Sequence, residues 1–76
     1  MNPRVIDVQV LNNYKLKIRF TNNEVKTFNA EPYLKYPIYE PLRDPNLFRE
    51  ARVSLGTVVW NNDIDFCPDT LFLEST

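Results

Sequence analysis

Alternation of apolar and polar residues in two stretches near the start of the chain constrains the fold more than any other feature. Ile6, Val8 and Val10 alternate with polar neighbours, and a second alternating stretch follows at residues 14–20. Its apolar positions are Tyr14, Leu16, Ile18 and Phe20, and its polar positions are Lys15, Lys17 and Arg19. A period of two residues is typical of strands that bury one face only. The pattern therefore predicts two neighbouring strands.

The turn between these strands follows from the register that it imposes. Two asparagines separate the strands, and asparagine tolerates the left-handed backbone that turns require. A two-residue loop would place Val10 opposite Lys15 and mix core-facing with solvent-facing residues. We therefore predict a three-residue loop at 11–13, with Asn13 in the left-handed conformation. In that register Ile6 faces the core.

A second asparagine pair predicts another turn and a third strand. A two-residue loop at this pair would pair Phe20 with Val25 and leave Phe28 on the solvent side. A three-residue loop at 21–23 would turn Phe28 and Lys26 inward instead. A bulge in the third strand is another solution, and the sequence leaves the register open. Each solution gives a three-stranded antiparallel meander.

Proline divides the middle of the chain into short elements. Its positions are Pro32, Pro37, Pro41 and Pro45, and together they forbid a continuous helix or a central strand. Residues 30–34 are expected to form one short turn. A helix is predicted over 44–50, because Asp44 can cap its free amides and proline suits its first position.

The last third predicts a hairpin and a closing helix. The hairpin covers 52–60 and turns at Gly56, which takes positive φ at no steric cost. Residues 64–66 are expected to form a brief edge strand, and a helix is predicted to start at Pro68. The whole is predicted as one α+β domain over 1–76, a three-stranded antiparallel meander plus a C-terminal hairpin. Two or three short helices are expected to pack on one face.

Composition excludes several classes of function. The chain has 76 residues, no His, one Cys and one Gly. Histidine-based catalysis, zinc fingers, internal disulfides and glycine-rich phosphate loops are therefore excluded. Nine basic and 10 acidic residues give a net charge of −1, which argues against capture of nucleic acid or an anionic membrane. We expect a cytoplasmic protein that is not an enzyme, binds no cofactor and does not enter a membrane.

Aromatic residues are the first candidates for a binding surface. Tyr33, Tyr36 and Tyr39 lie three residues apart in the proline-rich segment. One interpretation is a flap with packed rings and wet hydroxyls. The other is a protein-binding patch, because tyrosine is enriched at interface hot spots. Trp60 is a further candidate contact, although its place at the end of an apolar strand favours the core.

Charged and nucleophilic residues allow weaker hypotheses. Lys15, Lys17 and Arg19 would line the outer face of the second strand, where we favour a solvated surface partly neutralised by Asp7 opposite Lys17.

The C-terminal aspartates, Asp63, Asp65 and Asp69, have a spacing similar to that of an EF-hand. Pro68 stands where that loop needs glycine, so we reject this motif. One remaining hypothesis is a looser metal site. We favour the other, in which Asp65 and Asp69 satisfy the free amides and the dipole at the start of the last helix. Cys67 is expected to be a small buried residue rather than a nucleophile.

The C-terminal half also resembles a known family. The matching residues are Gly56-Thr57-Val58-Val59-Trp60, Asn62, Asp65 and Pro68-Asp69-Thr70-Leu71-Phe72, with Leu42-x-Asp44-Pro45-x-Leu47-Phe48 upstream. They are similar to the signature of a small bacterial family called domain of unknown function 2442. The resemblance implies a compact α+β domain with no assigned activity. It also implies an arrangement beside another small protein, interpreted as a toxin–antitoxin pair.

Two functional hypotheses follow. The first is a non-enzymatic interaction module, antitoxin-like or regulatory, that binds a protein partner or a second copy of itself. The alternative is a metal- or small-molecule-responsive sensor that uses the loop containing Asp63, Asp65 and Asp69.

Overall fold

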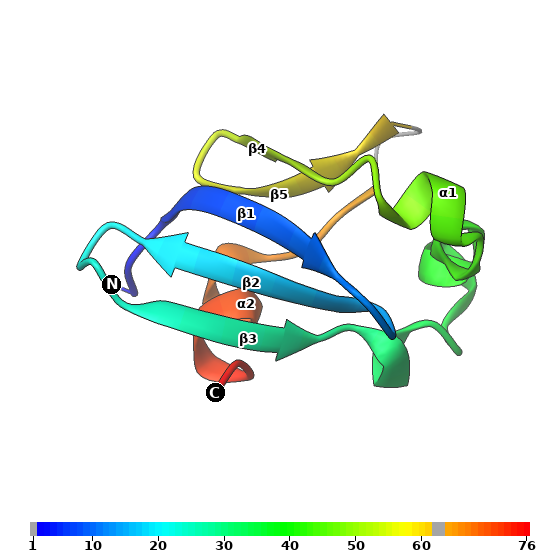
Figure 1. Ribbon diagram of the computed structural model, residues 1–76, viewed down its shortest axis with the longest axis horizontal. Helices are drawn as coiled ribbons and strands as arrows, with labels where there is room; N and C mark the ends of the chain where they lie inside the picture. The colour runs from blue at the N-terminus through cyan, green and yellow to red at the C-terminus, as the bar shows by residue number, and fades with distance from the viewer. Residues whose placement is uncertain (1, 62–63) are drawn as a thin grey trace.

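The computed structural model describes residues 2–61 and 64–76, which form two three-stranded antiparallel sheets and several short helices (Figure 1). The N-terminal sheet contains β1 (Val5–Leu11), β2 (Lys15–Phe20) and β3 (Val25–Asn29). The 3-10 helices η1 (Glu31–Tyr33) and η2 (Pro37–Arg43) and the helix α1 (Pro45–Phe48) follow. The C-terminal sheet contains β4 (Arg52–Ser54), β5 (Thr57–Trp60) and β6 (Ile64–Asp65), and α2 (Pro68–Leu73) follows it. The predicted α+β class is confirmed.

The first turn has the predicted length but lies one residue later. Val10 is opposite Leu16, so the loop is 12–14 rather than 11–13. Asn13 is left-handed as predicted, with φ 62°, and Tyr14 is left-handed as well, with φ 60°. Tyr14 leaves the strand because its ring packs against Phe48, with 5.2 Å between ring centres, and its hydroxyl donates to the Arg43 backbone carbonyl.

The alternating pattern of β1 is interrupted by a bulge. Val5 is opposite Phe20 while Asp7 is opposite Arg19, so Ile6 is the extra residue. The prediction that Ile6 faces the core is wrong: Ile6 is 44% exposed and Val5 is buried in its place. The Val5 amide donates to the Gly56 carbonyl at 2.9 Å, which fastens this end of β1 to the β4–β5 turn.

The second turn adopts the three-residue alternative. Leu16 is opposite Phe28 and Ile18 is opposite Lys26, so the loop is 21–23. Lys26 is accommodated on the inner face because its ammonium group lies 3.8 Å from the centre of the Phe72 ring. The same group donates to the Phe72 backbone carbonyl at 3.1 Å. The lysine stem therefore covers apolar surface while its charge stays partnered.

The proline-rich segment forms a chain of single helical turns. The predicted turn at 30–34 contains η1, and the predicted helix over 44–50 is the shorter α1. Asp44 caps α1 as expected, since its carboxylate accepts from the Asn46 amide at 2.9 Å. The helix η2 was not predicted from the sequence; its internal Pro41 offers no amide, and its Leu42 is buried.

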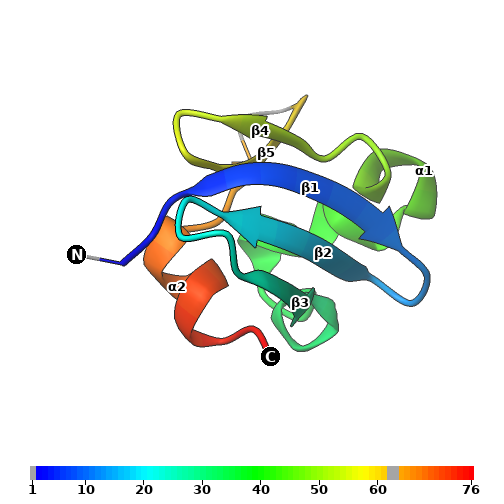
Figure 2. The same cartoon turned by 60° about the vertical axis from the view of Figure 1, so that its left-hand side comes forward.

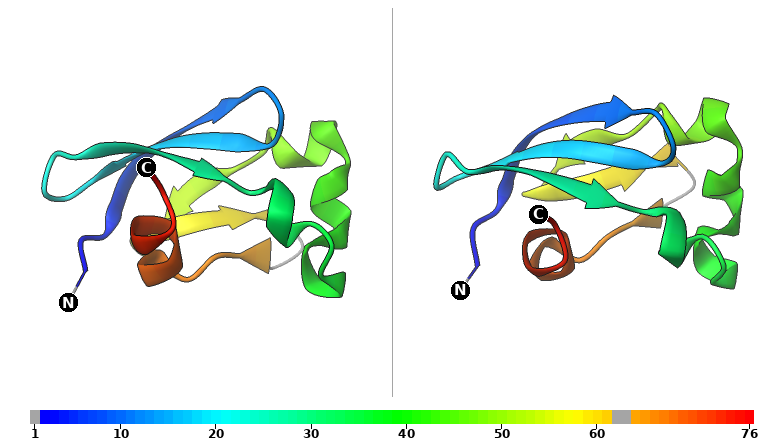
Figure 3. Two further views of the ribbon diagram at one scale, coloured as in Figure 1. Left: turned by 90° about the horizontal axis from the view of Figure 1, so that it is seen from below. Right: turned by 60° about the horizontal axis from the view of Figure 1, so that its bottom comes forward.

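The core lies between the N-terminal sheet on one side and the C-terminal sheet with α2 on the other (Figure 3). The buried apolar residues are Val5, Leu16, Ile18, Phe20, Phe28, Ala30, Leu34, Leu42, Phe48, Val58, Trp60, Ile64, Phe66 and Leu71. Phe66 is at the centre of an aromatic cluster, with ring centres 5.2 Å from Phe28 and 5.8 Å from Trp60. The Trp60 indole donates to the Phe48 carbonyl at 2.8 Å, which satisfies its only polar atom.

The β4–β5 turn generates the first testable prediction. Gly56 has φ +79°, and a Cβ atom there would lie 3.1 Å from Cδ of Arg4. The variant Gly56→Ala should therefore lower the free energy of unfolding by about 1–2 kcal/mol in urea denaturation. The control is Leu55→Asn, because Leu55 is also left-handed, at φ 51°, and asparagine tolerates that backbone. Equal stability of Gly56→Ala and the wild type would contradict the analysis.

Candidate functional site

The three tyrosines of the proline-rich segment comprise two packed rings, which we call the anchors, and one exposed ring. Tyr39 stacks on Phe66, with ring centres 4.4 Å apart and planes 6° from parallel. Tyr33 stacks on Phe28 at 5.4 Å and meets Phe66 edge-on at 5.6 Å. Tyr36 lies between these anchors in the sequence and is 48% exposed. Packed rings thus hold a segment that presents a third ring to solvent, which agrees with the interpretation of a packed flap. The protein-binding patch stays a prediction.

Around Tyr36 lies a surface with both apolar and charged groups, which we call the tyrosine surface. We define it by Pro32, Tyr33, Lys35, Tyr36, Ile38 and Glu74. All of these except Ile38 border a hollow of about 370 Å³. Ile38 is 66% exposed, and the Lys35 ammonium lies 5.4 Å from the centre of the Tyr36 ring. An apolar ring flanked by a cation and a carboxylate is suited to a protein contact.

The phenols of the two anchors remain protonated over an extended pH range. Burial raises the pKa of Tyr33, and the nearby Glu74 carboxylate raises it further. Burial also raises the pKa of Tyr39, with a further contribution from Asp65. Removal from water and a nearby negative charge both disfavour the phenolate. Both anchors can thus donate hydrogen bonds well into the alkaline range.

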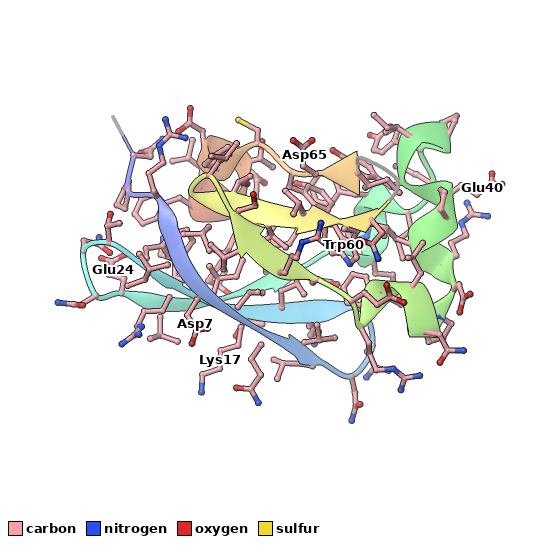
Figure 4. All side chains as sticks on the ribbon, turned by 90° about the horizontal axis from the view of Figure 1, so that it is seen from above. Asp7, Lys17, Glu24, Glu40, Trp60 and Asp65 are labelled. Atoms are coloured by element: carbon pink, nitrogen blue, oxygen red, sulfur yellow. The ribbon has the colours of Figure 1, made fainter. Side chains whose placement is uncertain are left out.

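Trp60 requires a correction as a candidate contact. Its side chain is 1% exposed and lies inside the molecule (Figure 4), so it offers no surface to a partner. The interpretation that places it in the core is confirmed. Trp60 supports the tyrosine surface indirectly, because it packs on Phe66 beneath Tyr39.

The aspartates are not brought together as a site within the described part of the chain. Asp65 is exposed in β6 opposite Val59, while Asp69 accepts from the Asn2 side chain at 3.3 Å. Asp63 lies outside the described residues. The predicted cap is wrong for the described aspartates: Cys67 is the N-cap residue of α2, and no side-chain bond caps this helix in segment 64–76. Asp69 does lie in the first turn of α2, where a carboxylate is favourable for the helix dipole. Residues 2–61 and 64–76 contain no group of three or more metal-ligating side chains.

The exposure of Cys67 and a second hollow were not predicted from the sequence. The prediction that Cys67 is buried is wrong, since it is exposed at the start of α2. The second hollow, of about 280 Å³, lies between the β1–β2 loop and α1 and is bordered by Tyr14, Pro45 and Phe48. Sequence reasoning missed it because it assigned Tyr14 to a strand, and only the contact with Phe48 draws that ring toward α1.

The outer edge of β3 is partly occupied by the chain itself. The Thr27 amide donates to the Thr76 carbonyl at 2.8 Å, and the Thr76 amide donates back at 3.0 Å. These two bonds use the backbone groups of Thr27 that point away from β2. The edge of β3 is therefore closed at this position, which leaves the tyrosine surface as the stronger candidate for a contact.

Comparison with known families identifies the chain. The model of a family described as protein of unknown function (DUF2442) matches residues 5–76. The chain belongs to the DUF2442 family. The family match confirms the resemblance found in the sequence, and its description assigns no activity. No curated protein and no solved structure shows detectable similarity. Within the described residues, no helix of this DUF2442 member is long and apolar enough to cross a membrane.

The raised pKa of Tyr39 generates a pH-dependent prediction. Its folded-state pKa lies above the ordinary value of about 10, so the neutral phenol contributes stability that is fully present below that pH. This contribution is lost as the pH rises through the folded pKa. Urea denaturation between about pH 9 and 11 should show a steeper loss of stability for the wild type than for Tyr39→Phe. Parallel pH profiles of the two proteins would contradict this assignment.

Proposed function

We propose that the protein is a non-enzymatic interaction module that binds another small protein through the tyrosine surface, in an antitoxin-like or regulatory role. The absence of histidine from the sequence supports the non-enzymatic part, because histidine is the commonest general base at neutral pH. The antitoxin-like role rests on the family resemblance alone, and the choice of surface rests on the geometry.

The observation that carries the proposal is an exposed ring on a rigid support. Tyr36 and Ile38 face solvent, while Tyr39 stacks on Phe66 and Tyr33 meets the Phe66 ring edge-on. A segment already held in one conformation loses little entropy when a partner binds, so its contact area converts efficiently into affinity. Tyrosine combines a large apolar area with a polar tip, as interface hot spots require.

A binding experiment tests the tyrosine surface. The double variant Tyr36→Ala/Ile38→Ser should weaken binding to the neighbouring small protein that the family resemblance implies by at least about tenfold, measured by isothermal titration calorimetry. Both residues are exposed, so thermal stability should remain close to that of the wild type. Leu55→Ser is the matched control, because Leu55 is 96% exposed and lies in the β4–β5 turn. Unchanged affinity in the double variant would refute the proposal.

The alternative function is a metal- or small-molecule-responsive sensor using Asp63, Asp65 and Asp69. It rests on their sequence spacing, since the described aspartates belong to no metal-ligating group in residues 64–76. A resident ion would raise the melting temperature by mass action. We expect no rise with Mg²⁺, Ca²⁺ or Mn²⁺ in a thermal-shift assay. A rise that Asp65→Asn abolishes would instead favour the sensor.

A further inference from the structure

The outer face of the N-terminal sheet is left uncovered. In Figures 1 and 2 no described helix crosses in front of β1 or β2. The helix α2 lies behind the sheet in Figure 1, and η2 and α1 lie beyond the right-hand end of the sheet. Leu16, Ile18 and Phe20 point to the core and are fully buried, so the alternate residues of β2 point outward. Those residues are Lys15, Lys17 and Arg19, all of them exposed.

Neighbouring strands complete what we call the basic face, defined by Asp7, Gln9, Lys15, Lys17, Arg19 and Val25. The register places Gln9 opposite Lys17 and both Asp7 and Val25 opposite Arg19. The predicted pairing of Asp7 with Lys17 is therefore wrong, because the loop lies one residue later. Asp7, Gln9, Lys17, Arg19 and Val25 border a hollow of about 330 Å³.

None of the three cations of the basic face forms an ion pair with an acidic residue among residues 2–61 and 64–76. The one ion pair there joins Lys26 to Glu24 at 3.9 Å. The Asp7 carboxylate accepts from the neighbouring Val8 amide at 3.0 Å. Three positive side chains on one strand thus face solvent together, and their mutual repulsion is relieved when an anionic group approaches.

Acidic residues are concentrated in the last part of the chain. The segment after Arg52 contains four acidic residues, Asp63, Asp65, Asp69 and Glu74, and no basic one. Figure 4 shows Lys17 and Asp65 on opposite sides. Asp65 therefore lies away from the basic face and does not neutralise its cations.

We propose that the basic face binds an extended acidic segment of a partner polypeptide. Alternate side chains of a strand are about 6.6–6.8 Å apart, so carboxylates at alternate positions of an extended peptide match the spacing of Lys15, Lys17 and Arg19. Val25 supplies an aliphatic contact at one end. A polypeptide fits better than single-stranded nucleic acid, because the six residues of the basic face include no aromatic ring on which bases could stack. This inference goes beyond the proposed function, since the two surfaces share no residue.

The test uses a fluorescein-labelled 12-residue peptide of alternating glutamate and valine, with fluorescence anisotropy at low salt. We expect saturable binding that weakens as salt rises. The double variant Lys17→Gln/Arg19→Gln should lose about tenfold in affinity. The matched control Arg49→Gln/Arg52→Gln removes the same charge elsewhere and should retain wild-type affinity. Asp7→Asn should bind more tightly than the wild type.

Several outcomes would overturn the proposal. These are equal binding of a glutamine–valine peptide, equal losses in the two double variants, and tighter binding of a 12-nucleotide thymidine strand. Self-association that disappears in Lys17→Gln/Arg19→Gln, measured by sedimentation, would assign the face to a second copy and also overturn it. Tyr36→Ala/Ile38→Ser should bind the peptide like the wild type, which separates this result from that of the proposed function.

Discussion

The contacts of the Phe66 ring are the interaction on which the rest of the structure depends. The ring meets Phe28 of the N-terminal sheet, Trp60 of the C-terminal sheet and Tyr39 of η2. Next to it, the Thr57 hydroxyl donates to the Phe66 carbonyl, so both the ring and the backbone of this residue are held. In a chain this short, one aromatic cluster must hold two small sheets together. The segment that presents the exposed ring of the tyrosine surface is held by this same cluster.

Local chemistry was predictable from the sequence, and contacts between distant segments were not. Asn13 and Gly56 mark turns because few residues tolerate positive φ, and Asp44 caps α1 through its own side chain. The bulge at Ile6 depends instead on the bond from Val5 to the Gly56 carbonyl. No alternation of residues within β1 contains that information. For the same reason, the sequence could give the inward position of Lys26 only as one of several alternatives for the register of β3.

The candidate sites show the same division. Spacing drew attention to the tyrosine segment, but only the structure separates the stacked Tyr33 and Tyr39 from the exposed Tyr36. Trp60 was too buried to serve as a contact, and Asp69 bonds Asn2 instead of capping a helix. The cations of β2 were identified from the sequence alone. Their grouping on an uncovered face became clear only once the positions of the helices were known.

The reciprocal bonds between Thr27 and Thr76 give the edge of β3 a built-in competitor. A foreign strand that adds to this edge must displace a segment of the same molecule, whose effective concentration is far above that of any dissolved protein. Fibril-like stacking and domain exchange through this edge are therefore disfavoured at equilibrium. These two backbone hydrogen bonds thus oppose misassembly through the edge of β3.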